Sequence, residues 1–192
     1  MIPKVIFKYS WVYEETLFVP NVKGVKYDRD RYVAYAKSYI KKLNKKWNKL
    51  NDKVLNYMSK ITGLKWRSRF IPCYLIKMGH VHAFSQPLTI SINNKWKNKI
   101  YHKDLDRFID ILVHELIHNL FIQNNLYKYF KYLLSKKYKS ENFTAAIHVP
   151  VHALHKEIYL KFFSKKRLER DIYISNLHEA YKRAWEIVDK EG

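Results

Sequence analysis

The sequence has 192 residues, of which 47% are hydrophobic, and this is enough for one domain with a substantial buried core. Four glycines and five prolines argue against a disordered chain and against a β-sandwich with many turns. A single cysteine excludes an internal disulfide and is typical of a reducing compartment. The chain shows neither a signal-like start nor about 18 consecutive apolar residues, so we expect a soluble cytoplasmic protein that does not bind membranes.

The net charge is +20, from 37 lysines and arginines against 17 acidic residues. A charge of this size in a small protein indicates a polyanionic partner, which can be nucleic acid, an acidic protein or an anionic membrane face. The alternative is a solvated lysine-rich surface without a specific partner. Because the basic residues are spread along the whole chain, both interpretations stay open.

The first third of the chain predicts a strand, a loop and a long helix. Lys4–Tyr13 has the alternation of a strand, and Phe18–Lys26 has the composition of a loop. Asp28 or Asp30 can cap a helix that runs without a break until Gly63. Its apolar residues follow three-four spacing: Val33, Ala36, Ile40, Leu43, Trp47, Leu50, Val54, Tyr57 and Ile61. Lysines cover its other face, which favours an amphipathic helix on its own core over a coiled-coil dimer.

The rest of the chain predicts two strands followed by helices. The strands are Cys73–Met78 and Pro87–Asn93, and Asp104 can cap a helix that continues to about Asn124. Three further helical segments follow: Leu126–Lys137, Thr144–Phe163 with Pro150 in it, and Leu168–Val188 as one or two helices. This order predicts an α+β fold, in which a small antiparallel sheet packs against several helices. We expect one domain over residues 1–192, with a long N-terminal helix and a C-terminal helical elaboration.

The stretch His114-Glu115-Leu116-Ile117-His118 is the most informative motif. On a helix His114 and His118 share one face, so both imidazoles can bind one Zn²⁺ ion. Glu115 lies beside them and can accept the proton of a zinc-bound water molecule. Leu105, Ile109 and neighbouring apolar residues place this set on a helix that faces the core, where polar groups are costly unless they are used.

A catalytic zinc normally has a third protein ligand, and the sequence offers a cluster of histidines for it. His152 is the preferred candidate, because it lies inside the second histidine-bearing helix just past Pro150. His148 and His155 are the alternatives, as ligands or as residues that support the ligands. Tyr159 on the same stripe is a candidate to stabilise an oxyanion, although ordinary packing is the better explanation for it.

Other polar residues are weaker candidates for the site. Cys73 is a possible thiolate ligand but is better explained as a buried structural cysteine. His80 and His82 can bind a metal but more readily line a loop near the cleft. Glu141, at a helix start, and Glu157 are weaker glutamate candidates for a ligand. The strand around Leu88–Ile92 can form the sheet edge to which an extended substrate adds, or it can be a plain core strand.

The segment His114–Asn119 resembles the zincin metallopeptidases, in particular the SprT-like proteases, their WLM relatives and the minigluzincins. The resemblance covers the motif helix, the strand before it and, loosely, the later histidine-bearing helix. It implies a zinc ion, Glu115 as general base, and hydrolysis of peptide bonds in a substrate held by an upstream edge strand. SprT-like enzymes cleave proteins on DNA, which would suit the charge of +20. This chain departs from them because His152 follows His118 by 34 residues, behind an extra helix.

We therefore predict a zinc-dependent metallopeptidase that acts on peptide or protein substrates. In this prediction His114, His118 and His152 bind Zn²⁺, and Glu115 moves the proton. The alternative function is a basic nucleic-acid-binding protein with a structural or vestigial metal site. A third interpretation is a latent enzyme in which a terminal segment fills the cleft.

Overall fold

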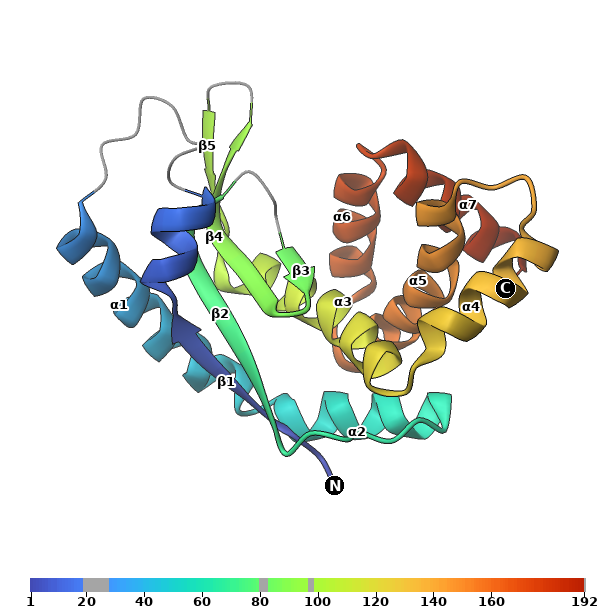
Figure 1. Ribbon diagram of the computed structural model, residues 1–192, viewed down its shortest axis with the longest axis horizontal. Helices are drawn as coiled ribbons and strands as arrows, with labels where there is room; N and C mark the ends of the chain where they lie inside the picture. The colour runs from blue at the N-terminus through green and yellow to red at the C-terminus, as the bar shows by residue number, and fades with distance from the viewer. Residues whose placement is uncertain (19–27, 80–82, 97–98, 192) are drawn as a thin grey trace.

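A five-stranded sheet lies beside a set of helices in the computed structural model, which describes residues 1–18, 28–79, 83–96 and 99–191 (Figure 1). The α+β class predicted from the sequence is confirmed. The strands are β1 (Lys4–Tyr9), β2 (Phe70–Gly79), β3 (Ala83–Ser85), β4 (Leu88–Trp96) and β5 (Lys99–His102). Their order in the sheet is β1-β2-β4-β3, and β5 also pairs with β4.

The sheet is mixed, so the antiparallel arrangement predicted from the sequence is wrong. β1 pairs with β2 in parallel, β2 pairs with β4 in parallel, and β3 and β5 are antiparallel to β4. A parallel pair needs a long crossover, and the helical segment between β1 and β2 supplies the first one. The short strand β3 lies on the far side of β4, which allows β2 and β4 to run in the same direction.

The helices follow the predicted order closely. Their bounds are η1 (Tyr13–Phe18, a π-helix), α1 (Arg29–Trp47), α2 (Asn51–Thr62), α3 (Leu105–Gln123), α4 (Leu126–Lys137), α5 (Phe143–Phe162), α6 (Lys165–Ser175) and α7 (Glu179–Glu191). The predicted cap of α3 is confirmed, since the Asp104 carboxylate accepts a hydrogen bond from the Arg107 N–H at 2.6 Å. The predicted loop Phe18–Lys26 lies almost entirely outside the described residues. No helix in the described part of the chain is both long and apolar enough to span a membrane.

The predicted long N-terminal helix is broken into α1 and α2 by three residues. Buried Asn51 fixes the break: its Oδ1 accepts from the Trp47 indole at 2.9 Å and from the Val5 N–H at 3.3 Å. Its Nδ2 donates to the Pro3 carbonyl oxygen at 2.9 Å. The start of α2 is thereby bound to the N-terminal strand. The break is not visible in the sequence, because three residues in a turn preserve the helical spacing of the apolar side chains.

Most buried apolar side chains belong to one cluster, which we call the main core. It contains alternate residues of β1, β2 and β4 together with apolar residues of α1, α2 and α3. Helix α3 lies at its centre, with Phe108, Leu112 and Leu116 fully buried. Burial of this kind stabilises by about 1.5–3 kcal/mol for each large side chain. The position of α3 is therefore set mainly by hydrophobic packing.

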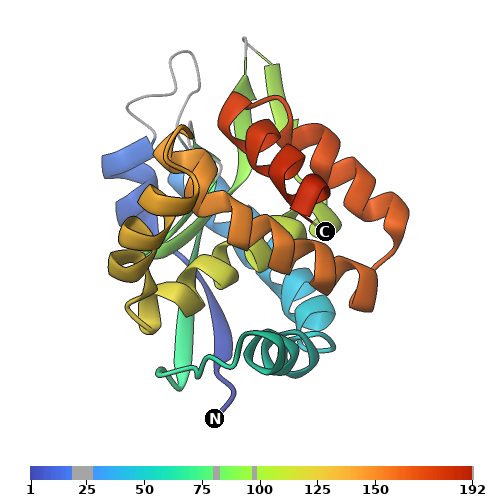
Figure 2. The same ribbon diagram turned by 90° about the vertical axis from the view of Figure 1, so that its right-hand side faces the viewer.

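A second group of buried residues, the C-terminal cluster, joins α5, α6 and α7. Its buried members are Val149, Tyr159, Leu168, Ala184, Trp185, Ile187 and Val188. In the view of Figure 2 these helices face the reader and cover one side of α3. Helix α5 takes part in both groups, because its Val151 and Ile158 belong to the main core. The C-terminal helices therefore form a layer of their own beside α3.

Candidate metal centre

Helix α3 presents His114, Glu115 and His118 as the sequence predicts. The two histidines lie one turn apart, and their Nε2 atoms are 3.2 Å from each other. Two nitrogens bound to one tetrahedral zinc at 2.0–2.1 Å lie about 3.3 Å apart. The spacing in the structure thus fits two imidazole lone pairs that point to one ion.

Helix α5 adds a third imidazole, from His148. Asn142 caps this helix by accepting from the Thr144 N–H at 2.7 Å, and the helix continues through Pro150. His148 lies against the Thr144 carbonyl oxygen, with Nδ1 at 2.7 Å from it. A carbonyl can only accept, so Nδ1 carries the proton and Nε2 keeps a lone pair. Metal-binding histidines are commonly oriented in this way by a backbone carbonyl.

The group that could hold a metal ion consists of His114, His118 and His148, whose candidate ligand atoms all lie within 4.8 Å of one another. His152, the ligand preferred from the sequence, is not part of this group. Its ring stacks on Trp185 instead, with centroids 4.4 Å apart and planes 15° apart. The geometry therefore favours His148, one turn earlier on the same stripe, because the packing of α7 turns His152 toward the C-terminal cluster.

His155 also lies close to the group without joining it. Its ring centroid is 5.6 Å from that of His114, and its ring packs edge-on against Tyr159 at 4.5 Å. Its Nδ1 lies 3.6 Å from Asp171, and neither ring nitrogen forms a hydrogen bond with the described residues. His155 therefore forms part of the wall around the group.

The three imidazoles are suited to metal binding because they are neutral. Burial, and next the imidazole of His118, hold the pKa of His114 well below its usual range. Burial likewise lowers the pKa of His118 to about 3, with a further contribution from His148, and burial lowers the pKa of His148. A neutral imidazole offers the lone pair that a metal ion requires.

Glu115 lies next to the histidines, and the pKa of its carboxyl group is raised. It is almost fully buried, and this burial raises its pKa to about 7, although the hydrogen bond from Ser85 acts in the opposite direction. The Ser85 hydroxyl donates to the Glu115 carboxylate at 2.9 Å, and Asn119 donates to the Ser85 carbonyl oxygen at 3.0 Å. Glu115 is therefore an oriented carboxylate that can take up and release a proton near neutral pH.

The strand that borders the site is β3, and of the two alternatives for Leu88–Ile92 the structure supports the core strand and not the sheet edge. Those residues belong to β4, which is covered by β2 on one side and by β3 on the other. β3 pairs with β4 alone in the described part of the sheet, and its Ser85 contacts Glu115. Three residues are too few to show a strand pattern in the sequence.

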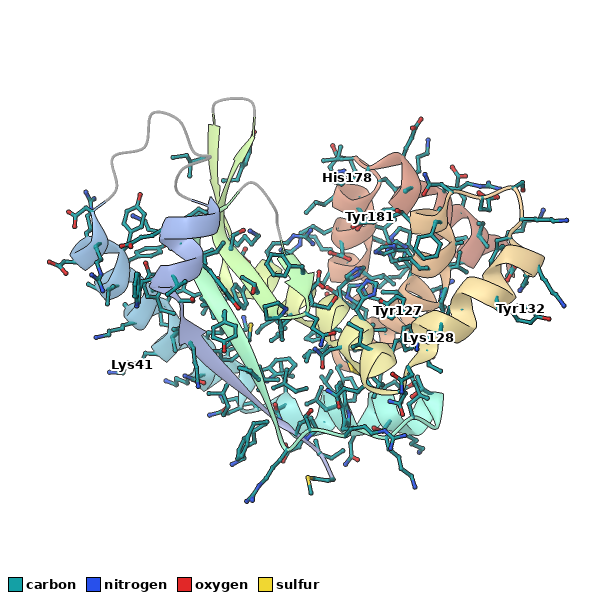
Figure 3. All side chains as sticks on the ribbon, viewed as in Figure 1. Lys41, Tyr127, Lys128, Tyr132, His178 and Tyr181 are labelled. Carbon is teal, nitrogen blue, oxygen red and sulfur yellow. The ribbon has the colours of Figure 1, made fainter. Side chains whose placement is uncertain are left out.

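Two tyrosines that sequence reasoning missed contact the histidine group (Figure 3). The Tyr127 hydroxyl lies within hydrogen-bond distance of His118 Nδ1. Asn125, with a φ of 56°, permits the tight turn that brings Tyr127 back to α3. The Tyr181 ring lies 4.4 Å from that of His148, and burial, followed by the charge of Glu115, raises the pKa of its hydroxyl.

The remaining sequence candidates lie elsewhere. Tyr159 is fully buried among the C-terminal helices and does not line the cavity. Cys73 is buried in β2, and burial raises the pKa of its thiol well above the usual value. Glu141 accepts hydrogen bonds from Arg183, and Glu157 is exposed. His80 and His82 lie outside the described residues.

A cavity of about 490 Å³ opens beside the histidines. Its walls come from β3, α3, α5, α6, α7 and the turn before α7, so it lies between the main core and the C-terminal cluster. His114 and Glu115 line it on one side, and His178 and Tyr181 line it on another. A ligand in this cavity would meet His114, Glu115 and Tyr181 together.

No family model, no curated protein and no solved structure matches this chain. The interpretation of the site therefore rests on its geometry and chemistry.

Proposed function

We propose that the protein is a metallopeptidase that hydrolyses peptide bonds with the help of a zinc ion. The observation that carries the proposal is a group of three neutral histidines next to Glu115, of which His114 and Glu115 line a cavity. Three imidazoles with a nearby carboxylate are the ligand set of a catalytic zinc. A structural zinc site normally uses four protein ligands and does not need a cavity.

In this proposal His114, His118 and His148 hold the ion. A zinc ion held by these three imidazoles would act as a Lewis acid and would lower the pKa of a bound water molecule toward about 7. Glu115 accepts the proton of the attacking water and then gives it to the leaving amine, a task suited to its pKa of about 7. The Ser85 hydroxyl holds the carboxylate in place during this transfer.

The substrate would lie as an extended segment along β3, where backbone hydrogen bonds to a strand can orient it. Tyr181 lines the cavity next to His148, and its raised pKa keeps the hydroxyl protonated. We assign to it the role that the sequence suggested for Tyr159, which is to donate a hydrogen bond to the oxygen of the scissile carbonyl.

The substitution Glu115→Gln tests this chemistry. The amide keeps the shape of the side chain but cannot accept a proton, so we expect kcat to fall by about 10²–10⁴-fold while bound zinc is unchanged. The measurements are zinc content by elemental analysis and turnover of a fluorogenic peptide library. Glu157→Gln on the exposed face of α5 is the matched control and should behave like the wild type. Undiminished hydrolysis by the Glu115 variant would rule out the mechanism.

Binding of nucleic acid is a second candidate function, favoured by one observation. Helix α1 and the turn after it carry exposed lysines on the side away from the main core, which are Lys37, Lys41, Lys42, Lys45 and Lys49. Within the described part of the chain no ion pair joins them to an acidic group. Figure 3 shows Lys41 on the opposite side of the molecule from Tyr181. Other basic residues are less available, since Arg167 and Arg170 bind aspartates.

A salt titration with a random-sequence DNA duplex tests this second function. Each phosphate contact contributes about −0.9 to the slope of log affinity against log salt. The triple variant K37E/K41E/K45E should reduce the slope by up to about 2.7. The variant K136E/K161E/K166E changes the net charge equally at exposed lysines elsewhere and should bind like the wild type. An equal reduction of the slope in both variants would show that net charge alone attracts the duplex.

A further inference from the structure

The cavity continues well beyond the histidine group along helix α3. Arg107, which also lines it, precedes His114 by seven residues. At 1.5 Å per residue, this places the far end of the cavity about 10 Å from the imidazoles. A depth of about 10 Å exceeds what the reacting bond itself requires and can accommodate a long side chain of a bound peptide.

The wall of this extension is largely apolar. Ile111 from α3 and Ile174 from α6 line the cavity, and Ala83 and Ala180 also contribute to its wall. Such a wall stabilises a hydrocarbon stem by removing its surface from water, at about 25 cal/mol for each Å².

The far end of the cavity contains charged side chains that are paired with one another. Arg107 pairs with Asp171, and their side chains are only 20% and 7% exposed. Both carboxylate oxygens of buried Asp110 are bound by arginines, Oδ1 by Arg167 and Oδ2 by Arg170. Arg167 also binds Asp106 at 2.6 Å. Arg107, Asp110 and Asp171 line the cavity, and each of these three charges is paired with a group of opposite charge.

We propose that this extension is a specificity pocket for a large uncharged side chain next to the scissile bond, and that the Arg107–Asp171 pair excludes charged side chains. The inference rests on the proposed peptidase function. A substrate carboxylate would meet Asp171 and compete with it for Arg107, and an ammonium group would meet Arg107. Either charge would also lose its hydration in a largely apolar pocket, whereas an uncharged side chain would not.

Peptides that differ at one position test the pocket. The variable residue is placed on each side of the cleaved bond in turn, as Gln against Glu and as Met against Lys, because each pair is similar in size. With the zinc-loaded wild type, kcat/KM should be about tenfold or more higher for Gln than for Glu, and for Met than for Lys. Calorimetric binding of the same peptides gives a readout that does not depend on turnover.

Removal of one charge at a time should produce opposite changes in preference. Asp171→Asn leaves Arg107 uncompensated and should shift the Glu-to-Gln ratio toward Glu by about tenfold. Arg107→Gln leaves Asp171 uncompensated and should shift the Lys-to-Met ratio toward Lys by a similar factor. The double variant R107Q/D171N restores neutrality and should return both ratios toward the wild-type values. Circular dichroism and thermal unfolding establish that each variant is folded.

A second pair of variants covers the case in which a single charge removal prevents folding. Ile174 is partly exposed on the cavity wall, so Ile174→Glu should favour Lys peptides and Ile174→Lys should favour Glu peptides. Unchanged ratios in the folded variants, in turnover and in binding, would overturn the pocket assignment. Binding with the expected preferences but no hydrolysis would leave the pocket in place and count against the proposed function.

Discussion

Helices α3 and α5 bring their histidines to one point, but the two helices are held in place by different packing. Helix α3 is buried in the main core, so His114 and His118 are positioned by hydrophobic packing on a rigid helix. Helix α5 is shared between the main core and the C-terminal cluster, so the position of His148 also depends on α6 and α7. One half of the site is thus part of the fold's centre, and the other half belongs to a layer that must dock onto it.

That layer is docked onto α3 by ion pairs between side chains and by contacts between aromatic rings. Arg167 reaches from α6 to Asp106 and Asp110 on α3, and Arg107 on α3 reaches back to Asp171 on α6. On α7, Tyr181 and Trp185 contact His148 and His152. Buried ion pairs add little net stability but require a specific geometry, because a missing partner leaves an uncompensated charge. The α5–α7 half of the site is therefore more sensitive to single polar substitutions than the α3 half.

The largest effect should follow from loss of a histidine ligand. His148→Ala removes one of the three lone pairs in the group, so we expect near-stoichiometric zinc to be lost, as with His114→Ala or His118→Ala. His152→Ala, one turn later on the same stripe, should retain zinc and serves as the control. Elemental analysis after dialysis is the measurement. Zinc retained by the His148 variant and lost by the His152 variant would restore the ligand set predicted from the sequence.

A smaller effect, on stability, is expected from disruption of the ion pairs that connect α6 to α3. Asp110→Ala leaves Arg167 and Arg170 without their shared carboxylate, and the free energy of unfolding should fall by about 3–5 kcal/mol. Asp110→Asn keeps one oxygen acceptor, so its free energy of unfolding should fall by less. Urea unfolding measures the loss of stability, and hydrogen exchange shows which elements are destabilised. Faster exchange in α6 than in β2 is expected, whereas equal acceleration in both would show that the two layers unfold as one.

Sequence reasoning succeeded where local signals determine the structure. The start of α3 at Asp104 follows from a capping side chain, and its length follows from an uninterrupted apolar spacing. The convergence of His114 and His118 follows from helix geometry alone. All of this information lies within about 20 residues of sequence.

It failed where partners come from distant parts of the chain. The break before Asn51 depends on Pro3 and Val5, which lie more than 40 residues away in the sequence. The choice between His148 and His152 depends on how α5 rotates against α3, and Trp185 of α7 influences that rotation. The direction of β2 relative to β4 depends on where the chain crosses the sheet. None of these relations leaves a periodic pattern in the sequence.

Lys103, on the side of α3 that faces the sheet, offers the smallest test, through the pH dependence of stability. On the sheet side, buried Lys103 donates from Nζ to the Ser91 carbonyl oxygen at 2.6 Å and to its hydroxyl at 3.0 Å. Burial, and next the charge of Arg107, lower the pKa of Lys103 to about 7, whereas a lysine in the unfolded chain has a pKa of about 10.4.

Between pH 7 and 10 the unfolded chain therefore binds a proton at Lys103 that the folded protein does not bind. Stability should rise with pH in this range, by at most about 1.4 kcal/mol per pH unit from this one group. Urea unfolding at pH 7, 8 and 9 measures the slope. Lys103→Met removes the titrating amine and should flatten the slope, while Lys41→Met on the exposed face of α1 should not change it. If the Lys103 variant keeps the wild-type slope, the pH dependence arises elsewhere, and Lys103 is charged in the folded protein.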